Sequence, residues 1–124
     1  MHVDFDLERL TTPVIDRITE LFRRRWSEFP EFFAAIDRIL AQEKERRGQT
    51  LVDTARGAVN IDLPSFSGLQ SRKAILWCVG LRDFYDAQGY SSAAGLFHAM
   101  ARRYQQAFSE SSAPSSGTPG VSAA

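Results

Sequence analysis

Apolar residues recur every three or four positions along four stretches of this chain, the spacing that lines one face of an α-helix. The first stretch carries Ile15, Ile18 and Phe22 in line. A Thr12–Pro13 pair precedes them, and these residue types suit the first positions of a helix. The sequence therefore predicts four helices, at residues 12–26, 28–47, 68–88 and 92–108.

The predicted helix over 28–47 divides into two halves. Its large apolar residues lie in the first half, whereas residues 41–47 are polar all round. We therefore expect the second half to project into water. Glu43 and Arg47 are one turn apart and are expected to form an ion pair. Gly48 is expected to end the helix.

The centre of the helix over 68–88 is apolar on every side, which is typical of a helix buried at the middle of a small domain. Cys78 lies there and is expected to be a core thiol. The short turn at Gly89 predicts an antiparallel hairpin with the helix over 92–108. The aromatic residues expected in the core are Phe22, Trp26, Trp77, Phe84 and Phe97.

Two short segments alternate apolar and polar residues, the period of a half-buried strand. They cover residues 3–7 and 59–63, and they are expected to pair with each other or across a dimer. For the N-terminal segment the pattern leaves a helix open, with its apolar face made by Val3, Leu7, Leu10 and Val14. Between the second helix and the second strand, Thr50 to Ala55 has the start signal of a short helical turn.

The sequence thus predicts a mainly α, compact single domain over residues 1–108, with one short two-stranded β element. Residues 109–124 are rich in Ser, Pro and Gly and carry one charge. Such a composition has little apolar surface to bury, so we expect a disordered tail.

Composition excludes several classes of protein. The chain has 15 basic and 15 acidic residues, which argues against a purely electrostatic binder of nucleic acid or lipid. No apolar run is long enough to predict a membrane span, and the first residues do not resemble a secretory signal. With one cysteine and no signal, the expected compartment is the cytoplasm.

A search for catalytic and cofactor motifs is negative. The sequence has no paired-cysteine or histidine metal motif and no glycine-rich phosphate loop, so neither metal nor cofactor is expected. The nearest titratable cluster is Asp83, Asp86, His98 and Tyr104, and a helical hairpin would bring His98 close to the two carboxylates. A small enzyme using Asp83, Asp86 and His98 is one alternative, and a surface of ordinary ion pairs is the other.

Residues 84–106 share their outline with a helix-turn-helix unit, namely helix, glycine turn and serine-capped helix. This gives a second alternative, a DNA-binding transcriptional regulator. Three features weigh against it: the first helix is too long for such a unit, Gly95 stands where a branched residue is expected, and the folded body is near neutral in charge. The residues that would contact DNA are His98, Arg102, Arg103 and Gln106.

The leading prediction is a small non-enzymatic binding or regulatory protein that acts through protein–protein contacts, with another protein or by self-association. Phe29, Phe32 and Phe33 place three large aromatics within five residues, which are hard to bury completely in so small a body. Arg25 lies nearby, and aromatic residues with arginine are typical of interfaces. The alternative is that all three aromatics belong to the core.

Overall fold

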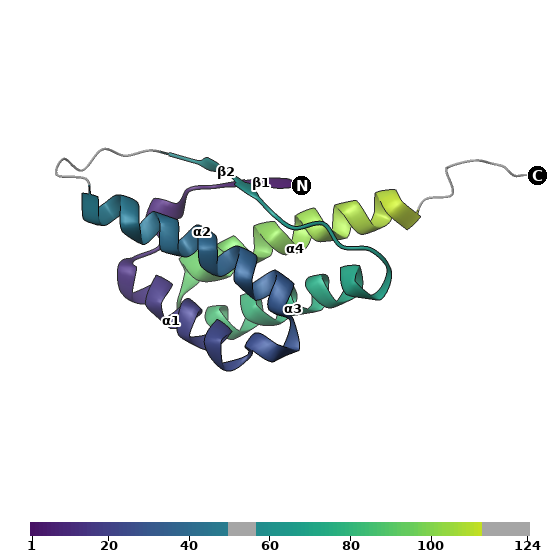
Figure 1. Ribbon diagram of the computed structural model, residues 1–124, viewed down its shortest axis with the longest axis horizontal. Helices are drawn as coiled ribbons and strands as arrows, with labels where there is room; N and C mark the ends of the chain where they lie inside the picture. The colour runs from purple at the N-terminus through teal and green to yellow at the C-terminus, as the bar shows by residue number, and fades with distance from the viewer. Residues whose placement is uncertain (50–56, 113–124) are drawn as a thin grey trace, which may run out of the picture.

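The computed structural model describes residues 1–49 and 57–112, and every structural statement below concerns these residues. The helical turn expected from Thr50 to Ala55 and the tail beyond Ser112 lie outside them. The elements in chain order are β1 (His2–Phe5), the 3-10 turn η1 (Leu7–Arg9), α1 (Thr12–Arg24), the 3-10 turn η2 (Trp26–Glu28), α2 (Pro30–Gln49), β2 (Val59–Asp62), α3 (Gly68–Ala87) and α4 (Ser91–Ser112). This confirms the mainly helical fold with one short two-stranded sheet (Figure 1).

The two strands pair antiparallel within the chain, with Val3 opposite Ile61. Met1 and Leu63 extend the ladder, because each backbone amine or amide donates to the carbonyl of the other, at 3.1 and 2.6 Å. Side chains alternate as expected, so Phe5 is buried and its neighbour Asp4 is exposed. The strand is therefore confirmed, and the alternative of an N-terminal helix is wrong.

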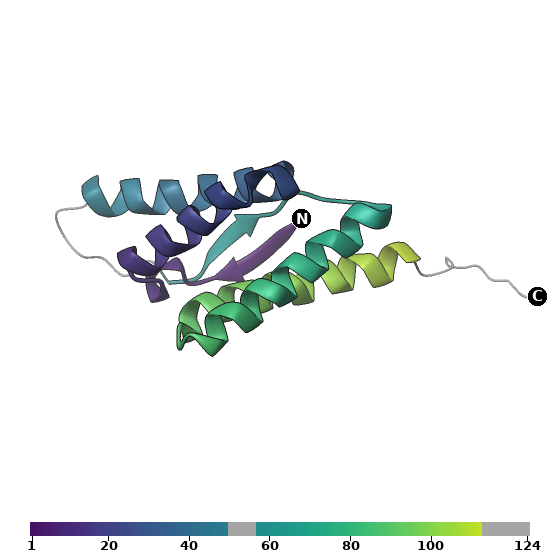
Figure 2. The same cartoon turned by 90° about the horizontal axis from the view of Figure 1, so that it is seen from below.

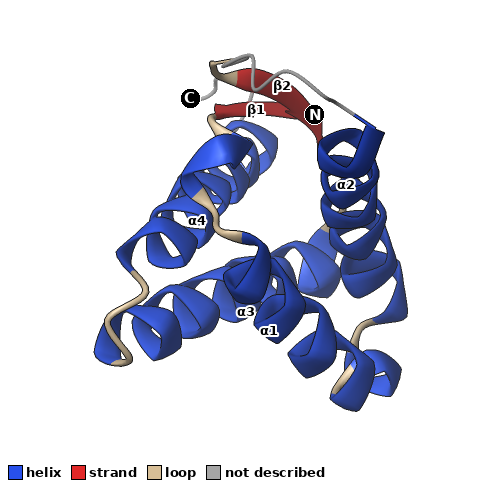
Figure 3. Cartoon of the chain, turned by 90° about the vertical axis from the view of Figure 1, so that its left-hand side faces the viewer, coloured by secondary structure: helices blue, strands red, loops and turns tan. Residues whose placement is uncertain are grey.

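The sheet closes one side of the helical body. Figure 2 shows β1 beside the hairpin of α3 and α4 and β2 beside α2, and Figure 3 shows α1 and α3 on the side away from the sheet. Arg103 of α4 fixes the first of these contacts, since its Nε donates to the carbonyl of His2 at 3.1 Å. The strands thus join the second helix to the fourth.

Aromatic rings form the centre of the core. Phe22 of α1 stacks on Phe33 of α2 at 4.9 Å between ring centroids and meets Phe97 of α4 edge-on at 6.2 Å. Phe29 and Phe32 stack on each other at 5.5 Å. The prediction of an exposed aromatic cluster at residues 29, 32 and 33 is therefore corrected: all three side chains are buried, because rings from several helices cover them.

Two aromatic residues that were expected in the core lie on the surface. Trp26 is 38% exposed and Phe84 is 47% exposed. Trp26 falls in η2, where the break between α1 and α2 interrupts the apolar face of α1. Phe84 lies one turn beyond the buried Leu81, at the edge of the covered face of α3, and both residues line one open hollow beside Gly80.

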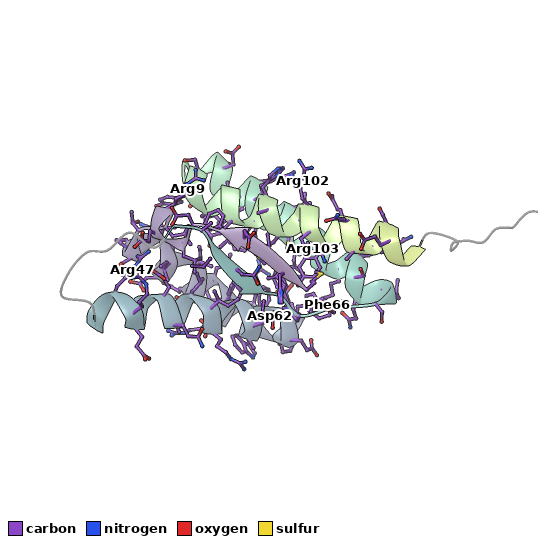
Figure 4. All side chains as sticks on the ribbon, turned by 90° about the horizontal axis from the view of Figure 1, so that it is seen from above. Arg9, Arg47, Asp62, Phe66, Arg102 and Arg103 are labelled. Atoms are coloured by element: carbon purple, nitrogen blue, oxygen red, sulfur yellow. The ribbon has the colours of Figure 1, made fainter. Side chains whose placement is uncertain are left out.

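The second half of α2 is exposed at Gln42, Lys44 and Glu45, but one side of it is covered, contrary to the prediction that it projects freely into water. Glu43 is only 2% exposed, and its carboxylate accepts hydrogen bonds from Arg46 and Arg47 at 2.9 and 2.8 Å. Arg47 also donates to the carbonyls of Leu7 and Leu10. These bonds satisfy polar backbone groups near η1, where Arg47 lies in Figure 4. The predicted ion pair between Glu43 and Arg47 is confirmed. Through Arg47 it also connects α2 to the N-terminal segment.

Helices α3 and α4 run alongside each other in opposite directions, which confirms the hairpin (Figure 2). Tyr85 and Phe97 stack across it at 5.8 Å. Gly89 supplies the turn with a φ of 85°, a conformation that glycine adopts readily. Helices α2 and α4 both extend beyond their predicted ends. Helix α2 runs through Gly48, and α4 continues four residues past position 108. At that position the Phe108 ring lies 5.5 Å from the guanidinium of Arg72 on α3.

Candidate functional site

Helix α3 has two apolar faces, and only one of them is covered. The inner face is buried against the other helices by Ala74, Cys78, Leu81 and Tyr85. On the opposite side Leu69 is 83% exposed and Leu76 is 70% exposed. Two leucines this exposed on one helix are unusual, because scattered single apolar residues are the normal surface pattern. The outer side of α3 is therefore an apolar surface that no other part of the described chain covers.

The outer residues of α3 are spaced alternately four and three positions apart. This average of 3.5 residues is the period of a seam between two packed helices. We call this row the outer seam; its members are Leu69, Lys73, Leu76, Gly80, Asp83 and Ala87. Figure 3 shows that α3 lies on the side of the molecule away from the sheet. The seam therefore follows the outside of the body for the full length of α3.

A shallow hollow of about 200 Å³ borders the seam at Gly80. It lies between α1 and α3, and its walls include Leu21, Trp77 and Phe84. Trp77 is fixed from below, since its ring meets the buried Phe33 edge-on at 4.8 Å. Arg25 forms part of the rim and is paired with Glu28 at 3.0 Å. Of the four interface residues predicted from the sequence, Arg25 alone is exposed and borders this surface.

Charges along α3 run against the preference of the helix itself. A helix dipole favours acidic residues in the first turn and basic residues in the last turn. Here the first turn has no acidic residue and the last turn has no basic one. Instead, Arg72 and Lys73 lie in the N-terminal half, while Asp83 and Asp86 lie near the C-terminal end. Arg82 also lies near the C-terminal end, where it pairs with Asp83 at 3.0 Å. The two ends of α3 thus differ in the charges that they present, and this difference is not one that the helix dipole favours.

The outer seam was not predicted from the sequence, because a helix that is apolar on every side is typical of the buried centre of a domain. In a body of four helices each helix lies at the surface, so one side of α3 stays exposed even where it is apolar. The signal that would have found the seam is the 4-3 spacing of Leu69, Leu76 and their neighbours. That spacing coexists with a second, opposite row from Ala74 to Tyr85.

The residues proposed for catalysis do not form a site. Asp83, Asp86 and His98 are all exposed, and among the described residues no hydrogen bond or ion pair joins His98 to either carboxylate. Asp83 pairs with the neighbouring Arg82 at 3.0 Å. In the same part of the chain no group of three His, Cys, Asp or Glu side chains is arranged to hold a metal ion.

Cys78 and Tyr104 are buried, and their burial disfavours the charged forms. Loss of hydration raises the pKa of the Cys78 thiol well above its usual range. The same effect raises the pKa of the Tyr104 hydroxyl. Both groups therefore stay protonated at neutral pH, and neither supplies a nucleophile.

The residues proposed for DNA contact lie along α4 beside β1. Arg102, Arg103 and Gln106 line one open hollow together with Val3 (Figure 4). Arg103 is held there by its bond to the His2 carbonyl, so it has a structural task as well. His98 is exposed on the same helix. Nothing in these contacts distinguishes a DNA surface from an ordinary helix face, and DNA binding stays a prediction.

A larger hollow, about 530 Å³, separates α2 from β2. Its polar walls include Arg38, Gln42 and the outward side of β2, where Asn60 bonds to Asp4 at 2.9 Å. The one buried carboxylate that lines it, Glu43, is held by Arg46 and Arg47. The hollow therefore presents no convergent group for chemistry, and the outer seam is the better candidate site.

None of the helices in the described part of the chain has the length and apolarity needed to span a membrane. Comparison of the chain with protein-family models, with curated proteins and with solved structures finds no match.

Proposed function

We propose that this protein is a non-enzymatic binding protein that acts through protein–protein contacts, and that the outer seam of α3 is its binding surface. The observation that carries the proposal is the exposure of Leu69 and Leu76 on a helix whose opposite face is already buried. Burying two such side chains against a partner is favourable by about 1.5–3 kcal/mol each. Within the single chain these two leucine side chains stay largely exposed.

The composition around the seam supports the proposal. An apolar centre, an aromatic residue and an arginine at the rim are typical of protein interfaces. Phe84 and Arg25 supply the last two features, on either side of the hollow beside Gly80. The aromatic pocket gives a partner a place to insert a side chain, since binding energy concentrates where anchors enter such pockets.

Site-specific photo-crosslinking tests this proposal. A photoreactive phenylalanine at Phe84 replaces one aromatic ring by another and should yield discrete covalent adducts with protein in cells that express the chain. The same group at Glu31, an exposed residue of α2, is the matched control and should yield none. Leu76→Asp should abolish the adducts at position 84, because it places a carboxylate in the seam.

The proposal fails if adducts form equally from both positions, or if Leu76→Asp leaves those at position 84 unchanged. Circular dichroism of each variant shows that the comparison is made between folded proteins. Because Leu76 is largely exposed, we expect that its replacement will not disturb the helical spectrum.

A further inference from the structure

The outer seam is complementary to itself when one copy is reversed. Leucine occupies two positions in its first half, and small residues occupy the matching positions in its second half. An antiparallel pair centred at the level of residue 78 puts Leu76 of one helix against Gly80 of the other. The same register puts Leu69 against Ala87. Each large side chain thus meets a small one, which is how two helices pack closely without leaving voids.

Gly80 provides the space that this packing needs. A Cβ atom built at Gly80 would meet no heavy atom within 4 Å, so the surface above it is open. Gly80 also lines the hollow bordered by Trp77 and Phe84, which deepens the seat for an incoming side chain. A glycine in the middle of a helix is unfavourable by about 1 kcal/mol relative to alanine. In the antiparallel pair, Gly80 makes room for Leu76 of the second copy, which accounts for a glycine at this position.

The charges fit the same register. Lys73 of one helix falls opposite Asp83 of the other, and the two-fold symmetry makes this pair twice. In the single chain the Lys73 ammonium lies 4.8 Å from the centre of the Phe29 ring, and Asp83 holds Arg82 through one carboxylate oxygen. The second oxygen of Asp83 has no partner among the described residues. Both groups therefore have capacity for a contact across the seam.

We propose that the partner of the outer seam is a second copy of this chain, joined to the first by an antiparallel, two-fold symmetric pair of α3 helices. The inference rests on the proposed function and names its partner. It requires no segment beyond the described residues. Residues 113–124 are a poor alternative occupant, because Val121 is their one large aliphatic residue and they contain no aromatic ring.

Sedimentation equilibrium of the full chain over a series of concentrations tests the dimer. A pair of 20-residue helices is about 30 Å long, which makes a small interface and hence a concentration-dependent equilibrium. We expect the mass to rise from that of one chain, 13.9 kDa, toward twice that value. A mass that stays at one chain throughout overturns the inference.

Charge reversal tests the register. Lys73→Asp places like charges opposite each other in both symmetric pairs, and so does Asp83→Lys. Each change should raise the dissociation constant of the dimer about tenfold, because both symmetric charge pairs change from attraction to repulsion. The double variant Lys73→Asp/Asp83→Lys restores opposite charges and should recover the dimer. A double variant that is as weak as the singles overturns the antiparallel register.

Lys73→Asp removes the ammonium from the Phe29 ring and Asp83→Lys removes the acceptor of Arg82, so circular dichroism and thermal unfolding of each dilute variant are the controls for folding. Gly80→Gln gives a second test of the same kind. It fills the seat of Leu76 with a good helix former, so the thermal midpoint should stay unchanged or rise while the dimer weakens. A dimer that tolerates this change contradicts the proposed contact.

The two proposals separate cleanly. If the wild-type chain stays monomeric but photo-crosslinking at Phe84 captures another protein in a way that Leu76→Asp blocks, the binding surface stands and the second copy does not. If crosslinking and sedimentation are both negative, the proposed function fails as well.

Discussion

Two buried tyrosines differ in what their hydroxyl groups contact. Tyr104 donates a hydrogen bond to the carbonyl of Pro64 at 2.9 Å and so fixes the segment that follows β2 onto α4. The hydroxyl of Tyr85 is buried and has no hydrogen-bond partner among the described residues. Burial raises the pKa of Tyr85 to about 12, because the charged form of the hydroxyl would lose its hydration there. The buried hydroxyl therefore stabilises the fold at Tyr104, where it is hydrogen-bonded, and lowers stability at Tyr85, where it is not.

The two phenylalanine variants should therefore differ in stability. Tyr104→Phe leaves the Pro64 carbonyl without its donor and should lower the free energy of unfolding by about 1 kcal/mol. Tyr85→Phe removes an unpaired polar atom and should be neutral or stabilising. Urea denaturation followed by circular dichroism measures both. Equal losses in the two variants would contradict this assignment, because they would mean that the Tyr104 hydroxyl gains no more stability from its contact than the Tyr85 hydroxyl does without one.

At the scale of elements, the bond network around Glu43 decides where α2 lies. Arg46 connects Glu43 to Glu8 at 3.1 Å, and its hydrogen bonds to Glu43 raise the pKa of the Arg46 guanidinium. Together with Arg47, which also donates to Thr12, these contacts fasten the end of α2 to the N-terminal segment. The network replaces the apolar contacts that this half of the helix lacks.

Removing the central carboxylate should loosen that attachment. Glu43→Ala leaves two arginines without their buried partner, and loss of one member of a buried ion pair lowers stability by about 3 kcal/mol. Glu31→Ala removes an exposed carboxylate from the same helix and should change stability by less than about 0.5 kcal/mol. Chemical denaturation of both variants tests this contrast. A small effect at Glu43 would mean that the arginines find other acceptors.

The limits of sequence reasoning follow from these elements. Periodicity identifies the four helices and the two strands because residues such as Phe22 and Ile61 need only a local face to be recognised. It does not identify the burial of Glu43, since that depends on Glu8 and on backbone carbonyls brought close by the fold. Likewise, the spacing of Leu69 and Leu76 is visible in the sequence, but their exposure is set by the number of helices available to cover α3.

At the scale of the molecule, the two faces of α3 separate folding from assembly. Leu81 belongs to the inner face and is 3% exposed, so Leu81→Ala should lower the free energy of unfolding by about 2–5 kcal/mol. Leu76→Gln changes an exposed position and should alter stability by less than about 0.5 kcal/mol, while weakening self-association. Thermal unfolding of dilute protein and sedimentation of concentrated protein measure the two effects. A large loss of stability at Leu76 in the dilute protein would assign it to the fold rather than to the interface.

The pairing of β1 with β2 also has a consequence for the order of folding. Val3 and Ile61 are paired although most of the first half of the chain separates them in sequence. Helices α3 and α4, in contrast, are connected by a short turn at Gly89. Closing a long loop costs entropy before its contacts form, so local hairpins form early and distant strand pairs form late. During synthesis, β1 is made before its partner and must wait until residues 59–62 have followed. It is therefore among the last elements of this fold to become paired.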